Sequence, residues 1–222
     1  MPAAGLELDA DRGLALTYVP VARRPAVAAL WRLDVALGQV LAGGREPLIS
    51  QIKLAWWREA LERLDRDSPP AEPVLESLAE HVLPAGISGA ELAAMEEGWR
   101  LLLGEDALTS EQLQVYASGR GGRLFALTAR LLGGDGAFAR PAGESWALVD
   151  LARRSGRPED VEAALAAARA KEVGRGWAPS LRPLGMLGAL AARDAEEGRP
   201  HWEAQGAPGR MLRMLRFRLS GR

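Results

Sequence analysis

Cysteine is absent from this 222-residue chain, and histidine occurs only twice, as His81 and His201. Without cysteine the protein has no disulfide, no thiolate metal site and no cysteine nucleophile. Two histidines far apart in the sequence argue against a histidine-rich metal centre and against a Ser-His-Asp triad. The formal net charge is −1, so no overall positive field attracts nucleic acid, and we expect no nucleic-acid partner.

Alternating strand patterns and long apolar runs are also missing. Ala, Leu, Arg and Glu dominate and aromatic residues make up 5% of the chain, which favours helices. No uninterrupted apolar run reaches about 18 residues, so a membrane-spanning helix is not expected. Residues 1–13 carry acidic side chains where a signal peptide would be basic and then apolar. We therefore expect a cytoplasmic all-α protein whose residues 1–13 form a flexible N-terminus.

Apolar spacing and helix-boundary residues predict a series of helices. Ser88 with Glu91, and Thr109 with Gln112, have the spacing of N-terminal capping boxes. The predicted helices cover residues 25–41, 47–64, 76–83, 88–102, 110–133 with an interruption at 118–122, 144–154, 158 onward, 183–197 and 208–219. The segment 133–143, rich in glycine and containing a proline, is predicted to be a turn. No long linker separates these elements, so we expect one domain over 1–222.

Five segments, in order, resemble parts of the squalene/phytoene synthase family. They are RRPAVAALWRLDVALGQV at 23–40, AWWREAL at 55–61, QVYASGRGGRLFALTARLLG at 114–133, GESWALVDLARR at 143–154 and, more weakly, 193–219. The resemblance implies an isoprenoid-synthase-type helical bundle around a central cavity. It also implies an enzyme that joins two prenyl diphosphates head to head, with magnesium ions held by two Asp-x-x-x-Asp motifs.

Neither of those aspartate motifs is intact in this chain. Other residues stand at the positions that the alignment assigns to the acids: Gly38, Ala42, Arg154 and Pro158. Carboxylates one helical turn apart present their oxygens on one face for a magnesium ion, and an arginine there repels the cation. We therefore expect no cofactor. If the protein is nevertheless active, magnesium is required, and the nearby acids Asp34 and Asp150 are the candidate catalytic residues.

The resemblance and the local chemistry give a set of candidate substrate-binding residues: Trp57, Arg58, Tyr116, Arg120, Arg123 and Arg153. Several also have a structural interpretation. Adjacent tryptophans at 56 and 57 diverge by about 100° around a helix, so that one would lie in the core and one at the rim. The arginine at 58 and Glu59 suit an exposed helix face, with Glu59 and Arg63 as an ordinary i,i+4 pair.

Two further features have alternative interpretations. The glycines of 119–122 could bind a phosphate through bare amides, or let two helices approach closely. Asp34 lies among apolar residues, and a buried acid needs a partner, for which Arg58 or Arg153 is suitable. A structural ion pair of Asp34 is favoured over a catalytic role.

The C-terminal segment 210–219 alternates arginines with Met, Leu and Phe. Such a basic amphipathic helix can pack as the closing helix of the bundle or lie on an anionic membrane surface. The leading hypothesis is a non-catalytic or altered family member, similar to the complex I assembly factor branch, that binds an isoprenoid, another lipid or a protein partner near the membrane. The alternative is an active squalene- or phytoene-type prenyltransferase.

Overall fold

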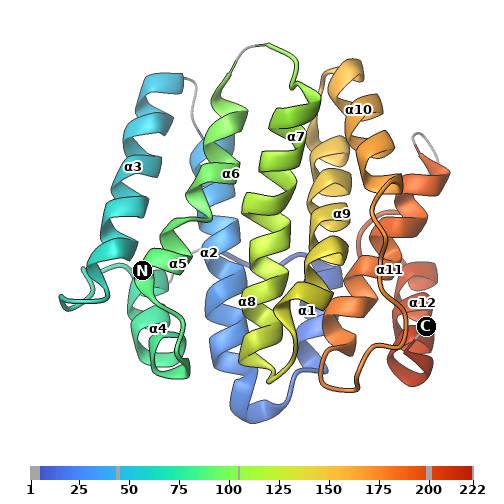
Figure 1. The fold of residues 1–222 in the computed structure, drawn as a ribbon, viewed down its shortest axis with the longest axis horizontal. Coiled ribbons are helices and arrows are strands. Elements are labelled where there is room, and N and C mark those ends of the chain that lie inside the picture. Colours follow the sequence, from blue (N-terminus) through green and yellow to red (C-terminus); the bar gives the residue numbers. More distant parts are fainter. Residues whose placement is uncertain (1–5, 44–45, 105, 199–201, 222) are drawn as a thin grey trace.

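Two long helices, α2 (Arg24–Ala42) and α9 (Gly136–Arg154), run through the interior of a helical bundle (Figure 1). This computed structural model describes residues 6–43, 46–104, 106–198 and 202–221, and in these ranges it contains helices and no strand. His201 and the first five residues of the predicted flexible N-terminus lie outside the described residues. The predicted all-α class is confirmed.

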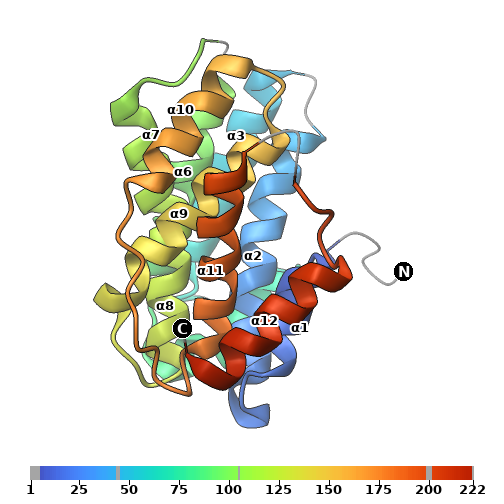
Figure 2. The same cartoon turned by 90° about the vertical axis from the view of Figure 1, so that its right-hand side faces the viewer.

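The remaining elements surround these two helices. In chain order they are α1 (Ala10–Thr17), η1 (Val21–Arg23), α3 (Pro47–Arg63), α4 (Pro73–His81), η2 (Leu83–Ala85), α5 (Gly89–Ala93), α6 (Glu96–Arg100), η3 (Leu101–Leu103), α7 (Ser110–Tyr116), η4 (Ala117–Gly122), α8 (Arg123–Leu131), α10 (Pro158–Arg169), α11 (Arg182–Glu197) and α12 (Pro208–Ser220). Helices α3 and α4 lie at one edge of the bundle, and α11 and α12 lie at the other (Figure 1). Figure 2 shows α1 beside α12, so the first and last described helices are neighbours.

Helix α2 forms because its apolar residues recur at helical spacing and Pro25 suits its first turn. With the preceding turn from Val21, it is long and apolar enough to cross a membrane, but more than half of that apolar stretch is buried inside the protein. The buried residues include Leu30, Trp31 and Leu37, each with no exposed surface. The apolar character of α2 is therefore that of a core helix packed against α3, α4 and α8.

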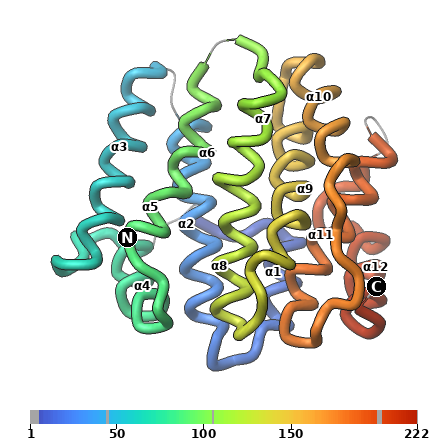
Figure 3. Tube along the Cα trace, in the orientation of Figure 1, coloured from blue at the N-terminus to red at the C-terminus, as the bar shows by residue number. Residues whose placement is uncertain are grey.

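Helices α7 and α8 form one continuous rod through η4, a six-residue π-helical segment (Figure 3). This segment is the predicted interruption at 118–122, and it widens the rod without breaking it. Its glycines serve close packing: a Cβ on Gly121 would lie 2.0 Å from the carbonyl oxygen of Gly143 on α9, and one on Gly119 would lie 3.1 Å from the backbone nitrogen of Gly98 on α6. The close-packing interpretation of these glycines is therefore confirmed.

Three sequence expectations are wrong in detail. The segment 133–143 is not a turn throughout, because α9 begins at Gly136, capped by the side chain of Asp135, and continues through Pro141. Packing against α8 and α11 outweighs the helix-breaking tendency of that proline. The predicted helix from Ser88 to Leu102 is divided into α5, α6 and η3.

The third correction concerns the N-terminus. Residues 6–13 do not form a free segment, because Asp9 caps α1 by accepting a hydrogen bond from the Arg12 amide, and Asp11 and Arg12 are buried. The charged side chains of this segment are held by partners elsewhere in the chain, Arg12 by Asp34 and Asp11 by Arg210.

Replacing Gly121 by alanine should force η4 and α9 apart, because the new methyl group meets a backbone oxygen that cannot rotate away. We expect a loss of about 1–3 kcal/mol, or more, in the free energy of unfolding, measured by urea denaturation. The matched control is Gly13→Ala in α1, where no atom lies within 4 Å of the added methyl group. That variant should gain up to about 1 kcal/mol through lower backbone entropy of the unfolded chain. Equal effects at both positions would contradict the close-packing account.

Candidate functional site

Arg120 is a buried residue of η4, which packs against α9 on one side and α6 on the other. Its side chain is 2% exposed, and it donates from Nε to Asp34 Oδ1 at 2.9 Å and from Nη2 to Asp34 Oδ2 at 3.1 Å. This two-point contact matches the planar fork of the guanidinium to the carboxylate. Asp34 in turn lies on α2 with 1% of its surface exposed.

The third nitrogen of Arg120 connects it to α9 and α7. Its Nη1 lies 2.7 Å from Asp150 Oδ2 and donates to the hydroxyl oxygen of Tyr116 at 2.5 Å. All three guanidinium nitrogens therefore have partners. Arg12 of α1 adds a second cation at 3.1 Å from Asp34, and Arg154 adds one at 2.9 Å from Asp150. The site is a cluster of alternating charges that connects α1, α2, η4 and α9.

Aromatic rings enclose the guanidinium of Arg120. Its central carbon lies 4.0 Å from the ring centre of Trp99, 4.9 Å from that of Trp146 and 5.8 Å from that of Tyr116. The negative faces of such rings attract a cation that has lost its water. These contacts explain how a fully charged side chain is accommodated in the core, where an unpaired charge would be costly.

The pKa values of the cluster follow from these contacts. Burial alone would raise the pKa of Asp150, but attraction from Arg120 and Arg154 outweighs it and lowers that pKa from 3.8 to about 2. Burial raises the pKa of Tyr116 to about 12. Burial opposes the charge on Arg120, but Asp34, Tyr116 and Asp150 together raise the pKa of the guanidinium well above its ordinary value. Near neutral pH, Arg120 and Asp150 are charged and Tyr116 is neutral.

A pocket of about 590 Å³ lies above this cluster. The polar residues that line it are Glu7, Asp9, Arg12, Asp34, Gln39, Arg120 and Arg154. The apolar ones are Leu8, Val35, Leu41, Ala42, Trp99 and Leu102, and Gly38 of α2 lines it beside Trp99. Its volume is in the range of about 300–1,000 Å³ that small-molecule sites occupy. The pocket therefore has one charged region, in which Arg12 and Arg120 pair with Asp34, and apolar walls.

Gly38 shows how the pocket differs from the pattern of the aspartate motifs. A Cβ on Gly38 would lie 2.8 Å from the Trp99 ring, so the ring occupies the space that a longer side chain would need. Trp99 is 6% exposed and also covers Arg120. An aspartate at position 38 would have to displace this ring.

The residues of the site do not fit a magnesium ion. Both remaining acids, Asp34 and Asp150, already bind guanidinium groups, whereas magnesium requires close to six oxygen ligands in octahedral geometry. In the part of the chain that the structure describes, no three His, Cys, Asp or Glu side chains are grouped so that they could hold a metal. A guanidinium between the two acids also repels any nearby cation.

The structure brings together four of the residues that the sequence singled out: Asp34, Asp150, Tyr116 and Arg120. The other four lie elsewhere. Trp57 is 8% exposed in the core while its neighbour Trp56 is 45% exposed, as the structural interpretation predicted. Arg58 is exposed and pairs with Glu62 at 3.1 Å.

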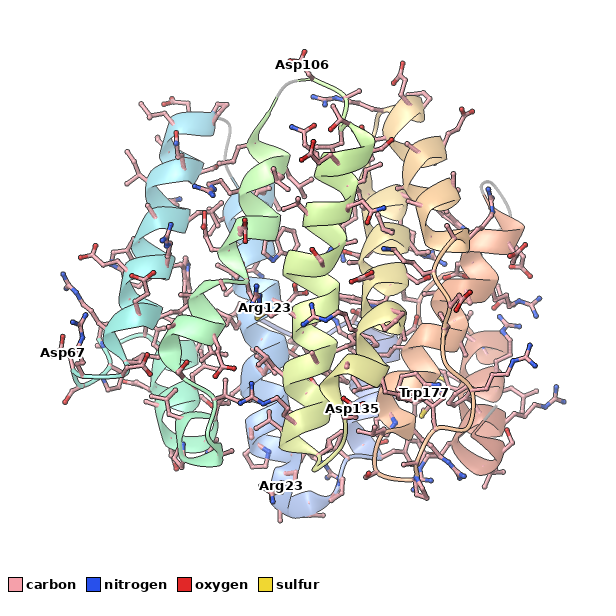
Figure 4. The ribbon with its side chains drawn as sticks, viewed as in Figure 1. Arg23, Asp67, Asp106, Arg123, Asp135 and Trp177 are labelled. Carbon is pink, nitrogen blue, oxygen red and sulfur yellow. The ribbon has the colours of Figure 1, made fainter. Side chains whose placement is uncertain are left out.

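Arg123 and Arg153 complete this set. Arg123 lies at the start of α8, halfway along the bundle (Figure 4), and it is not among the pocket-lining residues. Arg153 pairs with Asp194 of α11 at 2.8 Å. The predicted ion pair of Asp34 exists, but its expected partners, Arg58 and Arg153, are wrong, because neither helix position faces Asp34.

Sequence reasoning missed three residues of the site. Arg12 lies in the segment predicted to be flexible, and the sequence patterns do not single out Trp99 or Trp146. The strongest available signal was Asp34 itself, because a buried acid requires a cationic partner.

Asp194 is the centre of a second buried ion-pair cluster. Arg210 of α12 lies 2.7 Å from Asp194 and 2.8 Å from Asp11, and Arg153 of α9 also binds Asp194. The Gly206 amide donates to Asp11 at 3.0 Å. This cluster fixes the C-terminal helix against α1, α9 and α11.

The comparisons with known proteins give one match. The family model described as squalene/phytoene synthase matches residues 8–168, which include both acids of the cluster and four of the five resembling segments. The weaker segment 193–219 lies beyond the matched residues. No curated protein and no solved structure matches the chain.

Replacing Arg120 by methionine should destabilise the fold strongly, because Asp34 and Asp150 would then be buried without their shared partner. We expect a loss of about 3–5 kcal/mol in the free energy of unfolding, measured by urea denaturation. Adding Asp34→Asn and Asp150→Asn to this variant should recover part of the loss. The control is Arg58→Met, whose exposed ion pair should contribute almost nothing. An Arg120→Met protein as stable as the wild type would contradict this account.

At acidic pH, the free energy of unfolding should also depend on the charge of Asp150. The pKa of Asp150 is lowered from its ordinary value of 3.8 to about 2. The charged form of Asp150 therefore stabilises the folded protein at pH values above 3.8, and this stabilisation is lost as the pH falls toward 2. Asp150→Asn should therefore be less stable than the wild type at neutral pH, and the difference should narrow by roughly 2 kcal/mol below about pH 4. Urea denaturation across pH measures this. The control Asp67→Asn, at the exposed edge of the bundle (Figure 4), should have nearly the same free energy of unfolding as the wild type at neutral pH.

Proposed function

Because the chain belongs to the squalene/phytoene synthase family, we propose that it is a member that binds an isoprenoid or similar lipid without magnesium and without joining two prenyl diphosphates. The single observation that carries this proposal is the guanidinium of Arg120 held between Asp34 and Asp150. The positive charge of Arg120 lies between Asp34 and Asp150, which are the two candidate acids for holding a metal ion.

The pocket above Arg120 supports a lipid as the ligand. Leu8, Val35, Leu41 and Leu102 give it apolar walls, and a volume of about 590 Å³ is enough for a drug-sized or short isoprenoid molecule. Burial of each methylene group contributes about 0.8 kcal/mol, so an apolar chain supplies most of the binding free energy.

The charges around the pocket favour a neutral polar end on that ligand. Three carboxylates and three guanidinium groups line it, so they balance formally. Arg120 and Arg12 are bound to acids within the protein, and Arg154 binds Asp150. A diphosphate carries several negative charges and would have to break these pairs, whereas an alcohol or carbonyl would not.

An active prenyltransferase is the second candidate function, because Asp34 lines the pocket and Asp150 binds the same guanidinium group of Arg120. This alternative requires Arg120 to move aside so that magnesium can bind the two acids. It predicts magnesium-dependent consumption of farnesyl or geranylgeranyl diphosphate, which Asp34→Ala and Asp150→Ala would abolish.

Calorimetric titration separates the two functions. We expect farnesol or geranylgeraniol to bind with an affinity that magnesium does not change, and the corresponding diphosphates to bind at least about tenfold more weakly, with or without the metal. Val35→Trp should fill the pocket and abolish binding. Its control is Ile52→Trp, which adds the same side chain to the exposed face of α3, outside the pocket.

Tight binding of a diphosphate that requires magnesium would reject this proposal and favour the prenyltransferase. Binding that is equal in the wild type and in Val35→Trp would show that the ligand does not enter this pocket. If none of these molecules binds, the lipid proposal is wrong, and a protein partner becomes the function to test.

A further inference from the structure

Helix α12 has one face packed into the bundle and one face in solvent. Met214 and Phe217 are buried against α11, and Arg210 is held by the second ion-pair cluster. The outer face consists of apolar side chains with large exposed fractions: Met211 at 38%, Leu212 at 50%, Leu215 at 37% and Leu219 at 81%. Met211, Leu215 and Leu219 are spaced four residues apart, and Leu212 lies three residues before Leu215. Side chains at these spacings lie on one side of a helix, so the four form one continuous stripe.

The charged side chains of α12 itself are all arginines. The helix contains no acidic residue, and Arg216 and Arg218 lie on either side of the exposed leucines. Arg213 pairs with Glu203, and the guanidinium of Arg218 lies 5.6 Å from the ring centre of Tyr18. Arg182 adds a further positive charge by donating at 2.9 Å to the carbonyl oxygens of Arg218 and Leu219. The face therefore combines exposed apolar surface with net positive charge.

A groove of about 190 Å³ lies beside the stripe, between α11 and α12. Met186, Leu190 and Phe217 form its floor and wall, and Arg213 and Arg216 lie at its edge. An apolar groove edged by guanidinium groups suits an acyl chain whose negatively charged head group stays at the surface.

Helix α3 provides an informative contrast. It also exposes apolar side chains, namely Leu48, Ile49, Ile52 and Trp56. Its arginines, however, are paired with acids on the same helix, Arg58 with Glu62 and Arg63 with Glu59. Helices α3 and α12 lie at opposite edges of the bundle (Figure 1), so a change on one leaves the other intact.

We propose that the outer face of α12 binds the surface of an anionic lipid bilayer, with Met211, Leu212, Leu215 and Leu219 inserted among the lipids and Arg216 and Arg218 at the head groups. The sign of the charge selects this occupant, because an anionic membrane attracts arginines and a neutral protein surface does not. The buried pairs of Arg210 with Asp11 and Asp194 hold the helix in place, so the face exists before binding. This proposal is independent of the ligand in the pocket.

Sedimentation with phosphatidylcholine vesicles, with and without phosphatidylglycerol, tests it. We expect the intact chain to bind the vesicles that contain phosphatidylglycerol and to dissociate as salt is raised. Leu212→Glu with Leu215→Glu should lower the partition coefficient at least about tenfold, and Arg216→Gln should lower it about fivefold. The matched control, Ile52→Glu on α3, should bind as the wild type does. Circular dichroism should show that each variant remains helical.

Binding that is equal with and without phosphatidylglycerol, or that falls equally in the α3 control, would overturn the proposal. So would absence of vesicle binding together with a wild-type dimer that Leu212→Glu and Leu215→Glu dissociate, since the face would then be a self-association interface. A wild type that binds farnesol but not vesicles would reject this proposal and leave the proposed function standing.

Discussion

The buried contact between Arg120 and the two acids Asp34 and Asp150 is the interaction on which the rest of the structure depends. It connects η4 to α2 and α9, the two interior helices. A charge in the core is tolerated only when it is paired and hydrogen-bonded, so each of the three residues requires the other two. The same contact is the basis of the proposed function, because it holds a permanent cation between Asp34 and Asp150, the two candidate catalytic acids.

Close packing by glycine makes this arrangement possible. Gly121 and Gly143 let the rod of α7, η4 and α8 lie against α9, and Gly98 lets α6 reach the same segment. Arg120 is thereby brought between the acids, and Trp99 of α6 covers it while filling the space beside Gly38. The absence of a side chain at Gly38 leaves room for the Trp99 ring, and both residues line a pocket that has apolar walls and equal numbers of carboxylates and guanidinium groups.

The two buried ion-pair clusters stabilise different parts of the fold. The cluster at Arg120 forms the floor of the pocket, and the cluster at Asp194 fixes α12 to α1, α9 and α11. Both depend on α1, since Arg12 reaches Asp34 and Asp11 reaches Arg210. The short first helix therefore links the proposed ligand pocket to the proposed membrane-facing helix, although each can be tested separately.

The all-α class, most helix positions and the two capping boxes could be predicted from the sequence, because they depend on residues a few positions apart. The sequence also indicated that Asp34 needs a partner. The three-dimensional packing was needed to show that the partners are Arg120 and Arg12, that Trp99 covers Arg120, and that α9 continues through Pro141. Those outcomes depend on residues far apart in the chain, and local propensity carries no information about which of many arginines will lie within 3 Å of one aspartate.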